Sequence, residues 1–243
     1  MKFILLFLFA VPVFAGTVIN SYIKYPPTGG SSPVTVVEEV EWVGTTDPSG
    51  AFTPPGNSLL VASIRCKSPN GDGSTLMIPT TSGLTWTKRA GGTVDGVSAN
   101  VVDVWIFTSP VGASPGSMTV SMNKNHATCS KLVYSVEGYD AASPIGGTVT
   151  SRTTDAIDVT DWTAALSASS TANDAVFLVA AGLSVTAFTA ASGWTAGYLG
   201  EEVSQQQSAH TFIVAAKDDV ELGYYGNSSG QVGAWAGIVV NAE

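Results

Sequence analysis

Charged residues are scarce in this chain, and basic residues are the scarcer kind. Only 12% of the 243 residues are charged, with 10 Lys and Arg against 19 Asp and Glu. An acidic chain with few, scattered cations repels phosphate backbones and anionic membrane surfaces, so we expect no nucleic acid and no membrane as partner of the mature chain. The many small uncharged residues, including 26 glycines, are typical of an exported β-protein rather than of a cytosolic enzyme.

Histidine is also rare, which limits the chemistry of any site. The two histidines, His126 and His210, do not belong to a spacing typical of metal ligands, and we interpret them as a loop residue and a strand residue with polar neighbours. Ser114 lies in a G-x-S-x-G pattern, but the pattern falls between two predicted strands with no helix after it, so a turn is the better interpretation. We therefore predict no catalytic residues, and a protein that is not an enzyme.

The two cysteines, Cys66 and Cys129, leave two alternatives open. Export would place them in an oxidising compartment, where they could form a disulfide. Cys66 is in phase with apolar residues that look buried, whereas Cys129 is in phase with Lys131 and Glu137, which look exposed. Without a bulge the two thiols would face different sides, so two unpaired thiols remain the other alternative.

Long apolar runs are absent except at the N-terminus. Residues 3–13 are too short to span a bilayer comfortably, follow the basic Lys2 and precede a cleavage motif that ends in Ala15. We predict that residues 1–15 are a signal peptide, with an uncleaved anchor as the alternative. The predicted location is secreted or cell-surface.

The apolar spacing of an amphipathic helix is absent too. Short segments of alternating or β-branched residues, separated by Gly- and Pro-rich turns, predict strands, and the order of segments after residue 145 repeats the order before it. We predict an all-β fold with almost no helix: an antiparallel, jelly-roll-like β-sandwich over residues 56–243, in two pseudo-repeated halves. Its parts are an N-terminal extension with the first strands (16–55), the halves 56–145 and 173–243, and a linker between them with a strand at 156–162.

Acidic residues in two clusters raise the question of calcium. Asp155, Asp158 and Asp161 recur at every third position, and a second patch holds Asp218, Asp219 and Glu221. Calcium needs several such oxygens on one side, whereas a spacing of three along a strand alternates between faces. Solvated carboxylates are the preferred interpretation, and the first cluster is kept as a weak candidate for a calcium site.

Aromatic residues near turns are the candidates for contact with a ligand. Glycan rings stack on exposed aromatic faces, and Trp194, Tyr198, Tyr224 and Tyr225 lie near turns, where their rings could be exposed. A core position is the favoured interpretation for each of them, and ligand contact is kept as the alternative. Three further tryptophans lie inside predicted strands with apolar neighbours and are predicted to be core residues: Trp86, Trp105 and Trp235.

Four short segments carry a resemblance to a known kind of domain. They are 56–62 (GNSLLVA), 82–86 (SGLTW), 104–107 (VWIF) before a glycine-rich hairpin, and 134–140 (YSVEGYD) before Ser143-Pro144-Ile145. The pattern resembles a β-sandwich domain recurrent in secreted bacterial proteins and some phage virion proteins. The resemblance implies a jelly-roll-like sandwich used for display, adhesion or virion decoration, with no catalytic residues to carry over.

These observations predict a non-catalytic, exported structural or adhesive module, as a subunit of a surface assembly. Its expected partners are other copies of itself, or a surface protein or glycan. Two alternatives stay open. One is a virion surface or decoration protein, although a signal peptide departs from ordinary phage structural proteins. The other is a carbohydrate-binding module with calcium.

Overall fold

The computed structural model describes residues 32–44, 47–68, 78–95, 101–123, 129–153, 161–183, 187–203, 206–225 and 232–243. These residues form antiparallel strands and no helix, so the predicted all-β sandwich is confirmed. In the same ranges, no helical segment meets the length and hydropathy needed to cross a membrane. The predicted signal peptide, residues 1–15, lies outside the described residues.

The first half of the chain builds one large sheet and one small sheet. The large sheet has the strand order β1-β7-β2-β5-β4, and β3 pairs with β6 in the small sheet. An isolated bridge between Phe52 and Met118 extends the small sheet. The strands are β1 (Thr35–Val43), β2 (Leu59–Ser68), β3 (Pro79–Thr80), β4 (Thr87–Asp95), β5 (Val101–Pro110), β6 (Ser121–Met122) and β7 (Cys129–Glu137).

The second half repeats this arrangement. Its large sheet has the order β12-β13-β10-β15-β8, and its small sheet has the order β11-β14-β9. The strands are β8 (Ile145–Thr153), β9 (Asp161–Ala165), β10 (Ala175–Leu183), β11 (Ala187–Ala190), β12 (Thr195–Val203), β13 (Gln206–Val214), β14 (Asp219–Tyr225) and β15 (Val232–Val240).

The two large sheets have the same topology. Taken in chain order, the five long strands of each half lie side by side in the order first, fifth, second, fourth, third. The small-sheet elements also come from matching connections, because β3 and β11 precede the third long strand and β6 and β14 precede the fifth. Each half therefore winds back and forth between a large sheet and a small one, in the manner of a jelly roll.

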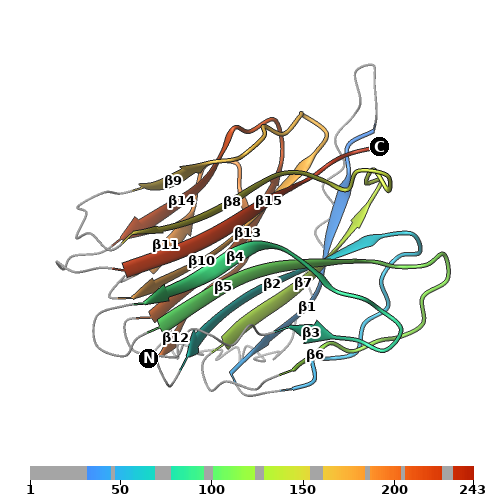
Figure 1. The fold of residues 1–243 in the computed structure, drawn as a ribbon, viewed down its shortest axis with the longest axis horizontal. Helices are drawn as coiled ribbons and strands as arrows, with labels where there is room; N and C mark the ends of the chain where they lie inside the picture. The colour runs from blue at the N-terminus through green and yellow to red at the C-terminus, as the bar shows by residue number, and fades with distance from the viewer. Residues whose placement is uncertain are drawn as a thin grey trace, which may run out of the picture.

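The large sheets pack against each other through a common apolar core. In Figure 1 the strands β8 to β15 lie mainly above the strands β1 to β7. The contacts obey an approximate two-fold relation: β2 lies on β10 at the centre, and β4 lies against β15 as β12 lies against β7. Alternation along β5 shows both environments, since Val104 and Ile106 face the inter-sheet core while Trp105 and Phe107 face the core of the first half.

A small sheet covers the outer face of each large sheet. Phe52, Val120 and Met122 complete the core of the first half, and Phe188 and Leu222 complete that of the second. The fold is thus a stack of four sheet layers with three apolar cores. The central strands of the large sheets are buried on both faces, and in the second half β10, β13 and β15 accordingly contain no Asp, Glu, Lys or Arg.

The halves begin earlier than residues 56 and 173. β1 pairs along its length with β7, and β8 pairs with β15, so both belong to large sheets. The apolar signal of β8 is weak because the chain is closely packed there: a Cβ at Gly147 would lie 2.2 Å from the Ala168 carbonyl oxygen. Of the strand predicted at 156–162, residues 156–160 lie outside the described ranges, and β9 begins at Asp161.

Candidate functional site

The inter-sheet core is apolar over most of its extent and polar at one place. On β2, Leu59 and Val61 face the second large sheet, and Ser63 and Arg65 follow in the same phase. All four side chains are buried. The polar residues here meet His210, which β13 contributes from the opposite sheet.

His210 forms hydrogen bonds with two serines of the first half. Its Nδ1 lies 2.5 Å from the Ser63 Oγ on β2, and its Nε2 lies 2.8 Å from the Ser130 Oγ on β7. A neutral imidazole has one donor and one acceptor, so one serine donates to the ring and the other accepts from it. The three side chains form a polar link, which we call the Ser–His–Ser link, between strands of different halves.

The surroundings of His210 keep its ring uncharged. Burial, and then the positive charge of Arg65, lower the pKa of His210 from 6.5 to about 3. Tyr198 of β12 packs edge-on against the imidazole, with ring centroids 5.9 Å apart. The Ser–His–Ser link is therefore neutral across the physiological pH range.

A serine bonded to a histidine is also the nucleophile–base pair of many hydrolases. Here the exposed fraction of His210 is 0%, and its second ring nitrogen is bonded to Ser130 rather than to a carboxylate. A substrate could reach these atoms only if the two large sheets separated. As it stands, the Ser–His–Ser link can hold the sheets together but cannot receive a substrate.

The cysteines are bonded to each other. Cys66 on β2 and Cys129 on β7 are paired in register and form a disulfide with an S–S distance of 1.98 Å. Both face the core of the first half. The expectation that Lys131 is exposed was wrong: its stem is buried in phase with Cys129, and its Nζ donates to the Gly44 carbonyl oxygen at 3.0 Å.

Two of the candidate aromatic contacts lie in cores. Trp194 is only 6% exposed and packs in the core of the second half, so its ring takes the core position rather than the alternative of ligand contact. The turn before β12 causes this, because the Trp194 N–H donates to the Ala191 carbonyl and the chain folds back over the sheet. Tyr198 is half-buried against the inter-sheet core.

The other aromatic residues divide into two groups. Trp105 and Trp235 are buried as predicted, and Trp86 is half-buried beside the core of the first half. Tyr224 and Tyr225 pair through their backbones with β11, but their side chains lie outside what the structure describes. No sugar-binding platform can be assembled from the described side chains of the four candidates.

The first acidic cluster falls largely outside the described ranges. Asp155, Asp158 and His126 lie outside the described residues, and of Asp161 the structure describes the backbone alone. Across the described ranges, no group of three or more His, Cys, Asp or Glu side chains is placed to hold a metal ion. Calcium binding therefore stays a prediction.

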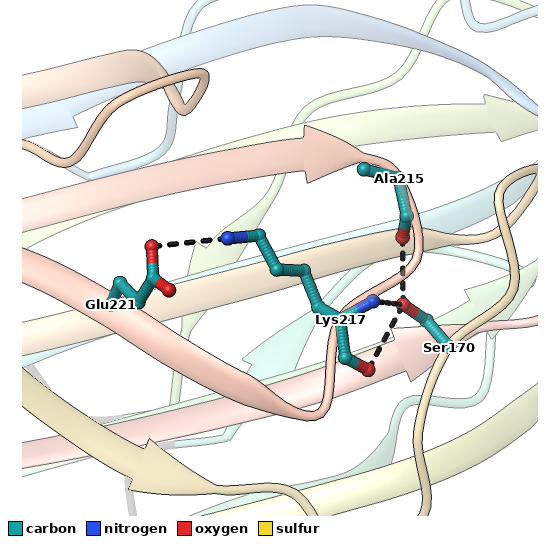
Figure 2. A network of polar contacts seen from close by, with 4 residues as sticks. All are labelled: Ser170, Ala215, Lys217 and Glu221. Carbon is teal, nitrogen blue, oxygen red and sulfur yellow. Dashed lines mark hydrogen bonds and ion pairs between the residues drawn. The ribbon is translucent and has the colours of Figure 1, made fainter.

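The second acidic patch is partly neutralised by a lysine. Lys217 Nζ lies 3.0 Å from Glu221 Oε2. Beside this ion pair, Ser170 Oγ accepts from the Lys217 N–H and donates to the Ala215 carbonyl oxygen, both at 2.7 Å. Figure 2 shows these contacts side by side. Burial, followed by the charges of Glu221 and Asp218, raises the pKa of Asp219. These contacts join two loops of the second half and have a structural role.

Ser114 is exposed in the loop between β5 and β6, without the helix that a nucleophile elbow requires. The strand order and the buried Ser–His–Ser link are those of an antiparallel β-sandwich with two jelly-roll-like halves. In comparisons with known proteins, no protein family, no curated protein and no solved structure matches the chain.

Sequence reasoning missed the partners of His210. Ser63 and Ser130 are 147 and 80 residues away from it in the chain. The sequence of β2 contains a signal for this. Leu59 and Val61 form one apolar face of the strand, and the next two residues on that face, Ser63 and Arg65, are polar. Such a break in an apolar phase indicates a polar partner on the opposite layer.

Proposed function

We propose that the protein is a non-catalytic, exported structural or adhesive module, used as a subunit of a surface assembly. The observation that carries the proposal is the burial of the Ser–His–Ser link. The groups best suited to acid–base chemistry, His210 and its two serines, are fully committed to joining the sheets. This arrangement favours a structural role, in stability and contact, over a catalytic one.

The sheet edges support a role in controlled contact. β1 and β12 are edge strands of the two large sheets. β1 carries Glu38, Glu39 and Glu41 with a register shift after Glu38, and β12 has two register shifts. Charges and bulges discourage the addition of foreign strands, so a module of this kind stays discrete at high local density.

The disulfide supports export. By the chain-entropy model, a crosslink across 63 residues stabilises the folded chain by about 4 kcal/mol, and it persists only in an oxidising compartment. Together with three separate apolar cores, it favours a module that stays folded outside a cell.

The test is made on the intact chain expressed in its own host. Cell fractionation and sedimentation of the purified mature chain should place it at the surface or in the medium and show an assembly or a bound surface component. A strict monomer that binds no surface would count against the proposal. Recovery in virus particles would favour the virion alternative instead.

A further inference from the structure

The pseudo-symmetry of the molecule provides an internal comparison for the Ser–His–Ser link. Ser63 on β2 pairs with Ile106 on β5, and at the equivalent place in the second sheet Val179 on β10 pairs with His210 on β13. Ser63 also pairs with Leu132 on β7, as Val179 pairs with Ala236 on β15, so Ser130 and Ala234, each two residues earlier, are equivalent. Under the approximate two-fold relation of the halves, Ser63 corresponds to Val179, His210 to Ile106 and Ser130 to Ala234.

The apolar counterpart shows that packing alone does not need polar residues at these positions. Ile106, Val179 and Ala234 are all fully buried in the inter-sheet core. Buried polar groups stabilise a core less than well-packed apolar ones of similar volume, and they make it sensitive to anything that changes their charge. The polar side of the interface is thus a place where the contact between the halves can respond to a signal.

We infer that Ser63, His210 and Ser130 form an acid-sensitive latch, which holds the two halves together while the imidazole is neutral and loosens their contact when it is protonated. The inference goes beyond the proposed function and does not depend on it. It concerns how the halves are joined, whatever the surface of the protein binds.

The latch is weakened by charge rather than by loss of hydrogen bonds. Both serine hydroxyls can rotate to accept from an imidazolium, since a hydroxyl is donor and acceptor alike. An imidazolium would, however, be a second cation beside Arg65 in an interface from which solvent is excluded. A buried charge of this kind is strongly unfavourable unless an opposite charge accompanies it.

Among the side chains that the structure describes, those around the ring carry no negative charge. β2 contributes Arg65, β12 contributes Tyr198, and the β10 neighbour in register is the apolar Val179. β7 contributes Ser130 and, further along, Tyr134, whose pKa is raised by burial and then by Glu38 and Glu41. These two glutamates lie on β1, the edge strand beyond β7.

The pH range follows from the sign of each shift. Because the pKa of His210 is lower in the folded chain than in the unfolded chain, the neutral ring stabilises the closed form fully above pH 6.5. As the pH falls from 6.5 to about 3, the equilibrium constant in favour of the closed form drops tenfold for each pH unit. The pKa of Glu38 is raised from 4.5 to about 7, so its protonation favours the folded form as the pH falls through that range. The two effects oppose each other between pH 6.5 and about 4.5, and below that pH only the histidine of these two groups still acts.

Each half can survive this loosening because it has a core of its own. Trp42 and Trp105 lie in the core of the first half, and Trp194 and Trp235 lie in that of the second. In the residues that the structure describes, the inter-sheet core contains tyrosine and phenylalanine but no tryptophan. Opening between the halves would therefore change tyrosine and phenylalanine signals while tryptophan emission stays constant.

The experiment is an acid titration of the mature full-length chain, followed by binding of the dye 8-anilinonaphthalene-1-sulfonate (ANS), near-UV circular dichroism and tryptophan emission. We expect dye binding to rise between about pH 5 and pH 3 before tryptophan emission shifts. His210→Gln, which cannot be protonated, should move this transition down by at least about one pH unit. His126→Gln is the matched control and should leave it unchanged.

A second variant keeps the test decisive if His210→Gln fails to fold. The triple variant Ser63→Val, Ser130→Ala, His210→Ile copies the apolar side of the interface onto the polar side, and it should remove the low-pH transition or move it further down. An unchanged transition in the folded variants would overturn the inference. So would simultaneous changes in dye binding and tryptophan emission, or a His210 pKa near 6.5 measured by NMR of the imidazole.

Discussion

Gly197 on β12 and Tyr134 on β7 meet at the interface of the two halves, and the missing side chain of the glycine makes room for the tyrosine. A Cβ at Gly197 would lie 2.4 Å from the Tyr134 Oη and 2.5 Å from the Leu132 Cδ2. Both contacted residues belong to the inter-sheet core. The halves therefore approach each other more closely here than any side chain at position 197 would allow.

Gly197→Ala should accordingly weaken the contact between the halves. Overpacking of a core by one methyl group costs roughly 1–3 kcal/mol. Urea unfolding of the two proteins measures the difference directly. Gly112→Ala is the matched control, because a Cβ at Gly112 meets nothing within 4 Å. Equal losses for both substitutions would contradict the close approach described here.

Reduction of the disulfide should destabilise the chain. Opening the bond between Cys66 and Cys129 restores chain entropy to the unfolded state, at a cost of about 2–4 kcal/mol. Urea unfolding with and without dithiothreitol measures this cost. The double variant Cys66→Ala, Cys129→Ala should start at the lower stability and be indifferent to the reductant. If the reductant acts equally on both proteins, the effect does not come from this bond.

Lys131→Ala should cost more than Lys88→Ala, although both lysines lie near a tryptophan ring. Lys88 Nζ is 4.0 Å from the Trp105 ring centroid and Lys131 Nζ is 5.4 Å from that of Trp42. Lys88 is exposed, whereas Lys131 is buried and its removal leaves the Gly44 carbonyl oxygen without its donor.

We expect a loss of about 2–4 kcal/mol for Lys131→Ala and under about 1 kcal/mol for Lys88→Ala. Thermal and urea unfolding of both variants check the order. Lys131→Met, which keeps the buried stem, should recover part of the loss. The reverse order of the two alanine variants would show that ring contact, rather than burial, determines the cost.

Glu38→Gln should stabilise the protein at alkaline pH and have little effect in acid. Burial, and then the charge of Glu41, raise the pKa of Glu38 to about 7, so above that pH the folded state carries an unfavourable carboxylate. The side chain is half-exposed, and with an allowance for solvent screening the gain is about 1 kcal/mol. Unfolding curves between pH 5 and pH 9, about two units on either side of that pKa, give the difference. Glu243→Gln, at an exposed position, should leave the pH profile as it is.

The strands could be predicted where apolar residues alternate on a local scale. β5 is the best example, since Val104 and Ile106 share one phase and Trp105 and Phe107 the other. The same segment also contained a signal for the number of layers, because both of its phases are apolar. A strand with two apolar faces is covered on both sides, which a two-layer sandwich does not provide.

The remaining features depend on contacts between distant segments. In β8, Gly147 lies against the backbone of Ala168 in the connection between β9 and β10, so this strand needs small residues and its composition carries little hydrophobic signal. The burial of Lys131 follows from a carbonyl on a segment 87 residues earlier in the chain. The partners of His210 come from two strands of the other half. No local periodicity encodes such pairings, so they had to come from the structure.

The identical winding of the two large sheets gives this chain the geometry of a homodimer whose subunits have been fused through the short segment after Glu137. In a dimer of identical subunits, every substitution is copied across the axis and appears twice. A fused pair is free of that constraint, so one half can acquire a titratable group while the symmetry-related position in the other half stays aliphatic. His210 and Ile106 are such a pair, and asymmetry of this kind is open only to a chain that is its own partner.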